Sequence, residues 1–176
     1  MKVRDCFLTA RKDEERGKKH KGLLIIDKDE SKAKEYIKKA KDSLEMCDLF
    51  KEKRFDYKIP EEWFYSMYYC ALAILAKFGV ESRSQRCTAL FLRYIKDKGV
   101  IDIDDDFVDG ITVHKEKEEK SYVDDREEAR YGTYVKNDDI IGKYDMMNNV
   151  CKKIISKTED IIYSDSKFDI PQELIK

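Results

Sequence analysis

Two arginines and two tyrosines lie close together in the segment SYVDDREEARYGTYV, residues 121–135. Arg126 and Arg130 are four residues apart, so on a helix they would share one face. Arginine binds phosphate oxygens through its planar guanidinium group, and tyrosine rings stack on bases. We therefore identify these arginines, with Tyr131 and Tyr134, as candidate nucleotide- or phosphate-binding residues.

A second pair of arginines, Arg83 and Arg86, follows the most apolar part of the chain. We expect both in the first turn of a helix that starts at Ser82, where the helix dipole also favours an anion. If this turn approaches Arg126 and Arg130, the four guanidinium groups form a local basic pocket. The sequence assigns no catalytic residue.

Each candidate also has a structural interpretation that needs no ligand. A charged helix face is ordinarily solvated, and Glu127 or Glu128 can pair with the neighbouring arginines. A tyrosine at this spacing commonly anchors a helix, with its ring buried and its hydroxyl at the edge. The two interpretations differ in whether the four arginines face one concave site.

Helical periodicity defines the elements that must position these residues. The predicted helices cover residues 31–54, 60–78, 82–98, 117–131 and 141–163, with a short helix or turn near 104–113. Only 7 glycines and 2 prolines occur, and no strand alternation is evident. We therefore predict an all-α, antiparallel up-and-down bundle of four to five helices over 31–163. Residues 1–30 are expected to form an irregular arm, with an apolar strap at Leu23–Ile26, and 164–176 a loosely held tail.

The predicted helix over residues 60–78, the central one, has the clearest start and stop signals. Pro60 at its first position and Gly79 after its end are typical helix boundaries. Its sequence is apolar on every face, which predicts burial on every face. Because this is more apolar surface than a small bundle needs, one aromatic face is a candidate dimer contact, and we expect a homodimer. Ser82 and Gln85 have the spacing of a capping box for the next helix.

The composition limits the classes of function. Charged residues make up 41% of the chain, and 36 basic residues nearly balance 37 acidic ones. Bulk charge therefore predicts no affinity for nucleic acid or membranes, and any such site must be a local patch. The longest uncharged run, 63–76, is too short to span a bilayer. The start MKVRDCF has no secretory pattern, so a cytoplasmic protein is expected.

The cysteines, the histidines and the acidic run of this sequence do not indicate a metal or another cofactor. The cysteine count is odd, and no CxxC pair occurs, which favours reduced, buried thiols over disulfides or zinc. His20 and His114 have no ligand-like partner near them in the sequence. The acidic run 102–106 lacks the glycine and terminal glutamate of a calcium loop, so charge at a helix start explains it better. The five cysteines are Cys6, Cys47, Cys70, Cys87 and Cys151.

Three pieces of the chain together resemble the HEPN domain family. They are the lysine-rich DESKAKEYIKKAKDSLEMC preceded by GLLIID, the segment YSMYYCALAILAKFGVESRSQRCTALFLRYI, and REEARYGTY. The resemblance covers roughly residues 5–163. It is greatest to the archaeal and bacterial HEPN proteins often encoded beside a minimal nucleotidyltransferase.

The resemblance implies an up-and-down helical bundle and two kinds of activity. Many members are metal-independent ribonucleases whose site is an arginine, a polar residue and a histidine four to six residues further on. Others are partners of nucleotidyltransferases in toxin–antitoxin pairs, in which a tyrosine near this motif accepts a nucleotide. By this resemblance, Tyr131 or Tyr134 would be such an acceptor.

The chain departs from the ribonuclease pattern. No histidine lies four to six residues after any of the four candidate arginines. Gln85 stands where related chains often have the histidine of Ser-x-x-His, and Glu127 follows Arg126 where some have a histidine. RNA cleavage through the 2′-hydroxyl needs a group that takes and gives a proton near neutral pH, and neither glutamine nor arginine does so.

Three hypotheses follow. The first is a dimeric, non-catalytic HEPN protein of toxin–antitoxin type that binds RNA, a nucleotide or a nucleotidyltransferase. The second is a metal-independent ribonuclease with a degenerate site, and the third is a helical adaptor without a ligand. The missing histidine separates the first from the second. A basic, concave pocket would separate the first from the third.

Overall fold

The computed structural model describes residues 2–112 and 137–175, and the fold is all-α, as predicted. Two three-residue strands, which the sequence did not predict, pair in a small antiparallel sheet. The described elements are, in chain order, α1 (Val3–Glu15), β1 (Leu23–Ile25), α2 (Glu30–Glu52), η1 (Asp56–Lys58), α3 (Ile59–Phe78), β2 (Val80–Ser82), α4 (Gln85–Asp97), α5 (Asp105–Gly110), α7 (Asn137–Tyr163) and η2 (Gln172–Leu174), the two η elements being 3-10 turns.

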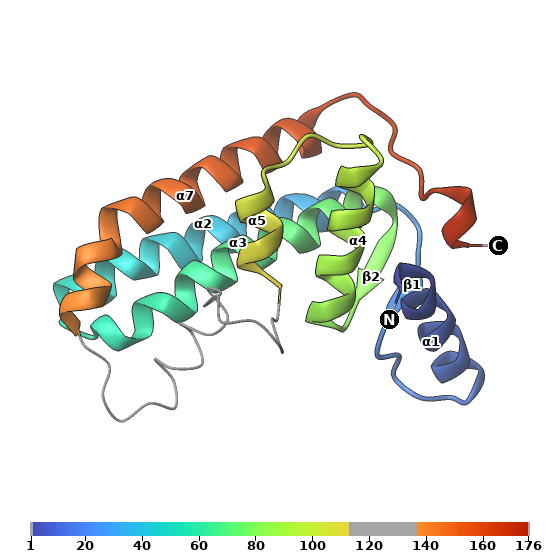
Figure 1. Ribbon diagram of the computed structural model, residues 1–176, viewed down its shortest axis with the longest axis horizontal. Helices are drawn as coiled ribbons and strands as arrows, with labels where there is room; N and C mark the ends of the chain where they lie inside the picture. Colours follow the sequence, from blue (N-terminus) through green and yellow to red (C-terminus); the bar gives the residue numbers. More distant parts are fainter. Residues whose placement is uncertain (1, 113–136, 176) are drawn as a thin grey trace.

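Three long helices form the body of the molecule (Figure 1). α2 runs antiparallel to α3, and α7 lies along both, antiparallel to α2. α4 and α5 pack beside the C-terminal half of α3. None of the helices in the described ranges is long and apolar enough to cross a membrane.

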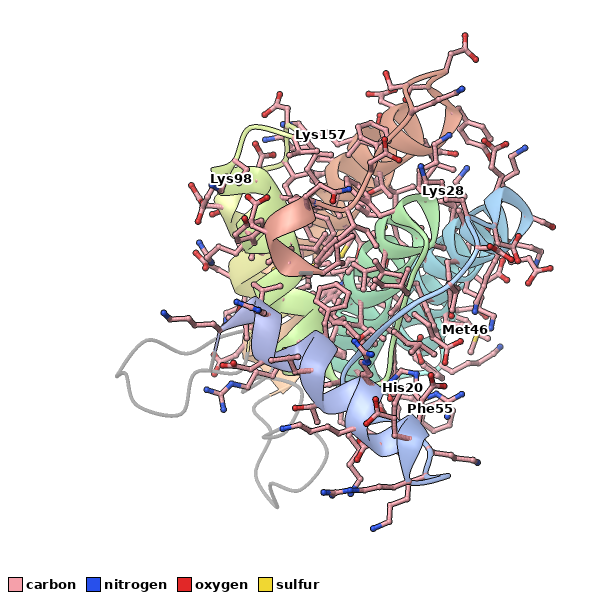
Figure 2. The ribbon with its side chains drawn as sticks, turned by 90° about the vertical axis from the view of Figure 1, so that its right-hand side faces the viewer. His20, Lys28, Met46, Phe55, Lys98 and Lys157 are labelled. Carbon is pink, nitrogen blue, oxygen red and sulfur yellow. A yellow bond between two sulfur atoms is a disulfide. The ribbon has the colours of Figure 1, made fainter. Side chains whose placement is uncertain are left out.

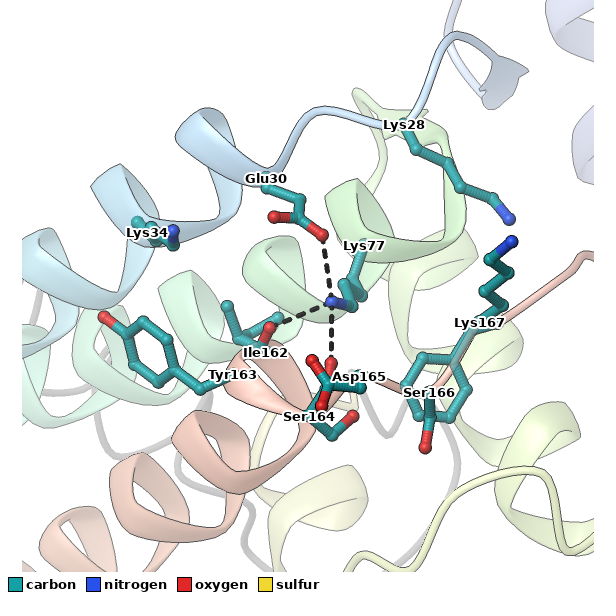
Figure 3. Close-up of a pocket in the computed structure, with 11 residues that line it drawn as sticks. Lys28, Glu30, Lys34, Lys77, Ile162, Tyr163, Ser164, Asp165, Ser166 and Lys167 are labelled. Atoms are coloured by element: carbon teal, nitrogen blue, oxygen red, sulfur yellow. Dashed lines mark hydrogen bonds and ion pairs between the residues drawn. The ribbon is translucent and has the colours of Figure 1, made fainter.

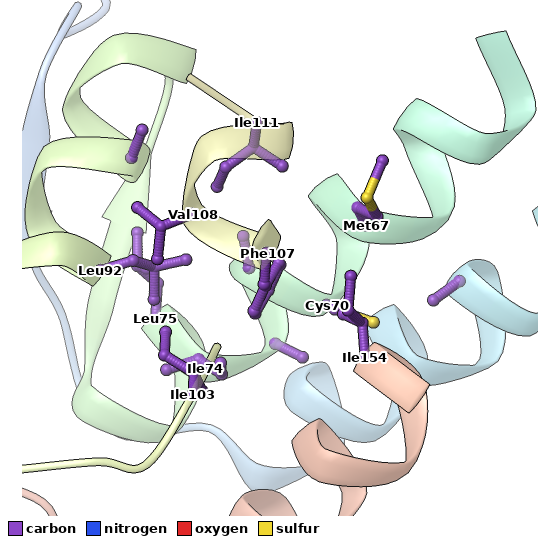
Figure 4. Close-up of a cluster of buried hydrophobic side chains, with 14 of the residues drawn as sticks. Met67, Cys70, Ile74, Leu75, Leu92, Ile103, Phe107, Val108, Ile111 and Ile154 are labelled. Carbon is purple, nitrogen blue, oxygen red and sulfur yellow. The ribbon is translucent and has the colours of Figure 1, made fainter. Parts of the chain in front are cut away.

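The predicted central helix is α3, and most of it is buried, although Tyr65, Tyr68 and Tyr69 are only half-buried. Figure 4 shows where four helices meet: Cys70 and Ile74 of α3, Leu92 of α4, Phe107 of α5 and Ile154 of α7. Burial of each large apolar side chain contributes about 1.5–3 kcal/mol. The helix ends as predicted, because Gly79 has a left-handed backbone (φ 74°). A Cβ atom at this position would lie 2.7 Å from the carbonyl oxygen of Ile26.

The predicted start of the following helix is wrong. Ser82 belongs to β2, where it pairs with Leu23, so it cannot cap the helix. Ser84 is the cap instead, and its hydroxyl accepts a hydrogen bond from the backbone N–H of Cys87 at 3.3 Å. α4 therefore begins at Gln85, and Arg83 precedes it.

The N-terminal segment is not the irregular arm that the sequence predicted. The buried residues of α1 follow helical spacing, but the charges between them obscured the pattern. The predicted strap becomes β1, which pairs with β2 in the register Leu23↔Ser82 and Ile25↔Val80. The buried residues of α1 are Val3, Cys6, Phe7 and Ala10.

The prediction of reduced thiols is wrong for two of the five cysteines. Cys6 of α1 and Cys87 of α4 form a disulfide across a sequence separation of 81 residues. Cys47, Cys70 and Cys151 are buried free thiols, as predicted. Burial raises the pKa of both Cys70 and Cys151 to about 12, so both remain protonated.

The C-terminal tail is packed rather than loose, contrary to the prediction. Leu174 is 5% exposed, because η2 lies against α1. The ring of Phe168 contacts that of Phe78, with centroids 5.2 Å apart. The phenol of Tyr94 donates to Glu173 at 2.6 Å. These contacts were invisible in the sequence, since they join the tail to distant helices.

The last two described helices match the sequence patterns more closely, and the helix predicted over residues 117–131 lies outside the described residues. α7 begins four residues before the predicted start at 141, and its predicted inner face is buried. The acidic run provides the start of α5, where Asp104 pairs with Lys153 and Lys157 of α7 at 3.0 and 2.9 Å. Among the described residues, no cluster of side chains is suited to hold a metal ion.

Candidate nucleotide-binding face

The predicted site residues are only partly within the described ranges. Arg83 lies between β2 and α4, where its Nε donates to Glu81 at 2.9 Å. Arg86 is exposed in the first turn of α4. The convergence of four arginines stays a prediction. The other four candidates lie outside the described residues: Arg126, Arg130, Tyr131 and Tyr134.

Three side chains contact the carboxylate of Glu81, and one of them is Arg83. The carboxylate contacts Nε2 of His20 at 3.1 Å, Nζ of Lys32 at 3.5 Å and Nε of Arg83 at 2.9 Å. Partial burial raises the pKa of Glu81. The hydrogen bond with His20 and the charges of Lys32 and Arg83 lower it by more, so the pKa of Glu81 lies below its usual range. Glu81 is therefore ionised at neutral pH.

His20 is held inside this group. It is 4% exposed, lies beside α1 (Figure 2), and contacts a carboxylate 61 residues away in the sequence. Its Nδ1 atom has no hydrogen-bond partner in the described part of the chain. Sequence inspection found no partner for His20, because the contact depends on the pairing of β1 with β2.

A cluster of hydroxyl groups joins β2, α4 and α3. Thr88, which is fully buried, donates to Oγ of Ser82 at 2.7 Å, and Ser82 donates to the carbonyl of Ser84 at 3.1 Å. Burial raises the pKa of Tyr68, and its hydrogen bond with Thr88 opposes this shift. The cluster fixes the start of α4 relative to the tyrosines of α3.

Three half-buried tyrosines form a row on α2 and α3, hereafter the tyrosine row: Tyr36, Tyr65 and Tyr69. The rings of Tyr65 and Tyr69 are stacked, with centroids 5.9 Å apart, and Tyr36 stacks on Tyr69 at 6.3 Å. Nζ of Lys39 lies 5.7 Å from the ring centroid of Tyr36 and 5.8 Å from that of Tyr69. The row places parallel aromatic rings beside a cation at the surface.

The aromatic run of α3 was predicted to be core, and this is correct for only part of it. Trp63 and Phe64 are 5% and 1% exposed, whereas Tyr65, Tyr68 and Tyr69 are half-buried. The four-residue spacing of Tyr65 and Tyr69 could have indicated a shared face. No local signal could have placed Tyr36 against Tyr69.

The Glu81 group and the tyrosine row belong to one face of the molecule. Lys32, Tyr36 and Lys39 follow i, i+4, i+7 spacing on α2, so they lie on one ridge of this helix. The ridge begins at Glu81 and continues to the tyrosine row. Aromatic rings and cations therefore alternate along it.

This arrangement is chemically suited to binding. Exposed tyrosine rings stack on bases, and lysine or arginine side chains contact phosphates. His20, the only histidine among the described residues, is buried against Glu81 and does not reach the tyrosine surface as a free base. Within the described part, the face thus combines cations and aromatic rings and has no exposed histidine.

Comparison of the chain with models of known protein families gives no match. Comparison with curated proteins gives none either. The geometry of this face is therefore the basis for inferring a function.

Proposed function

We propose that the protein is a non-catalytic, HEPN-like protein that binds single-stranded RNA or nucleotides, with the tyrosine row as its base-stacking surface. The observation that carries the proposal is the row itself. Two pairs of stacked rings are half exposed, and one lysine lies over two of the three rings. Such rings stack on any base, and each stacked base contributes about 1–3 kcal/mol.

Lys39 at the row and Arg86 at the start of α4 would supply the contacts to phosphate. Arg86 is exposed at the positive end of the α4 dipole. Lys32 and Arg83 are ion-paired with Glu81, so they contribute less to binding a phosphate than Arg86 and Lys39. With two phosphate contacts, the slope of log affinity against log salt concentration would be about −1.4.

Fluorescence anisotropy with a labelled oligonucleotide of ten uridines tests the proposal. Tyr69→Ala is expected to weaken binding about 5- to 100-fold, which corresponds to the loss of one stacked base. Tyr57→Ala is the matched control, because Tyr57 also has a lysine over its ring but lies in η1, outside the row. Equal losses in both variants, or no loss in Tyr69→Ala, would refute the proposal.

The ribonuclease alternative is tested with the same RNA in EDTA. We expect no cleavage, because His20 is buried and Gln85 donates its side-chain amide to the carbonyl of Ile111. Cleavage that is abolished by Arg126→Ala and Arg130→Ala would establish the degenerate ribonuclease instead.

The predicted homodimer would use the same surface, since the row contains Tyr65 and Tyr69, two of the aromatic residues of α3 that are left half exposed. Sedimentation velocity on wild type and Tyr69→Arg tests this use of the row. A dimer that Tyr69→Arg dissociates, together with no RNA binding by the wild type, would favour an adaptor that binds another protein, such as a nucleotidyltransferase. A monomer that binds RNA would favour the stacking surface.

A further inference from the structure

A pocket of about 550 Å³ opens where the start of α2, the end of α3 and the end of α7 meet. Figure 3 shows this cavity, hereafter the Lys77 pocket. Its volume lies within the range of sites that hold small molecules. It is separate from the tyrosine row. Lys34 lines the pocket whereas Tyr36 lies in the row, and residues two apart on a helix point about 200° apart.

The wall of the pocket is fixed by a buried cation. Lys77 is 8% exposed, and its Nζ donates to the carbonyls of Ile162 and Ser164 at 3.0 and 3.2 Å. The third partner is Oε1 of Glu30 at 3.3 Å. These acceptors match the three N–H groups of an ammonium ion, and the carbonyls at the negative end of α7 stabilise its charge. Lys77 is therefore a structural residue that joins the three helices.

Further lysines surround the opening. Lys28, Lys34 and Lys167 line the pocket and are exposed. Figure 3 shows the side chains of Lys28 and Lys167 reaching toward each other from opposite walls. Like charges placed in this way repel each other, and the carboxylate of Asp169, whose pKa is lowered first by Lys28 and also by Lys167, offsets part of this repulsion. The lining has four lysines against two acidic residues, an excess of two positive charges, in a chain whose net charge is −1.

The acidic partners of these lysines leave room for a ligand. Glu30 is engaged by Lys77. Lys28 pairs with Asp169 at 2.6 Å, but the two side chains are 44% and 83% exposed, and such surface pairs are weak enough for a phosphate to replace the carboxylate. Lys34 lies over the ring of Tyr163, with its Nζ 5.8 Å from the centroid. Three cations at one opening fit several phosphate oxygens better than a single carboxylate.

Aromatic and hydroxyl groups complete the lining. Phe168 is half-buried against Phe78, so one ring face is fixed at the pocket wall. Tyr163 and Ser166 lie nearby in the same lining. A flat, apolar ring beside a cluster of cations is complementary to a base that carries phosphates. We propose that the Lys77 pocket binds a nucleoside polyphosphate, with the phosphates on Lys28, Lys34 and Lys167 and the base against Phe168.

Isothermal titration calorimetry with ATP, without added metal, tests this proposal on the full chain. Lys28→Gln is expected to weaken ATP binding about tenfold, which corresponds to one charged hydrogen bond. Lys98→Gln is the matched control, because Lys98 also pairs an exposed ammonium group with a carboxylate of the tail, Glu173, but does not line the pocket. We expect its affinity for ATP to equal that of the wild type.

Two further variants and a second ligand, tripolyphosphate, complete the test. Lys167→Gln should weaken ATP binding as Lys28→Gln does, whereas Tyr69→Ala should leave it unchanged, because Tyr69 belongs to the other face. Tripolyphosphate should bind more weakly than ATP, since it lacks the base. No saturable ATP binding, equal affinity for tripolyphosphate, or equal losses in Lys28→Gln and Lys98→Gln would each overturn the proposal.

Discussion

The helical body, made of α2, α3 and α7, and the N-terminal segment, made of α1 and β1, are attached to one core by different kinds of contact. In the body, apolar side chains at helical spacing pack continuously along three long helices. The N-terminal segment adds only a few side chains to this core, among them Phe7, whose ring packs on that of Phe91. It is otherwise held by discrete links, which are the Cys6–Cys87 disulfide, three pairs of sheet residues and the contact of His20 with Glu81.

The two regions are therefore expected to lose structure independently. Continuous packing makes the body cooperative, because each buried side chain contacts several neighbours. Discrete links allow local opening at a lower free energy than global unfolding. The Glu81 group lies at the boundary of the two regions, so opening of the N-terminal segment would also alter the candidate nucleotide-binding face.

The largest effect is expected from a cavity in the body. Ile74→Ala removes a fully buried side chain of α3 and should lower the free energy of unfolding by about 2–5 kcal/mol. Urea denaturation followed by circular dichroism measures this change. Since the body is cooperative, amides of all three long helices should exchange faster together. Faster exchange confined to the N-terminal segment would contradict the comparison.

The next effect is expected from loss of the disulfide. Cys6→Ala should lower the free energy of unfolding by about 2–4 kcal/mol, because the bond closes a loop with a sequence separation of 81 residues. Hydrogen exchange measured by mass spectrometry should show faster exchange in residues 3–25, with α2, α3 and α7 still protected. Reduced wild-type protein is the control and should behave like the variant. Uniform loss of protection would show that the two regions unfold as one.

The smallest effect concerns the pH dependence of the link at Glu81. The pKa of Glu81 is lower in the folded protein, so its contribution to stability is complete above its unfolded pKa of about 4.5 and is lost as the pH falls through its folded pKa. Glu81→Gln should therefore cost no more than about 1 kcal/mol at pH 7. The difference from wild type should shrink below about pH 4. Urea denaturation between pH 3 and 7 measures it, and a constant difference would refute the assigned ionic contribution.

The candidate face was only partly predictable. Arg83 and Arg86 were identified from their residue type, but the expected position of Arg83 inside a helix was wrong because strand pairing occupies Ser82. Tyr65 and Tyr69 were assigned to the core, with one aromatic face of the helix as a candidate dimer contact, since an apolar helix gives no signal of which face remains open. No signal in the sequence added Tyr36 to them. Lys77 appeared only as a charge at the end of an apolar helix, and nothing local linked it to Ile162.

The sequence by itself determined the all-α class, the positions of α2, α3, α4, α5 and α7 to within a few residues, and the boundary of α3 at Gly79. Those features depend on periodicity and helix-end residues, which are local. Only the tertiary structure decided which distant residues meet. Lys77 and Glu30 are 47 residues apart, His20 and Glu81 are 61 apart, and Cys6 and Cys87 are 81 apart. Such contacts follow from how helices and strands pack in space, and no spacing along the chain encodes them.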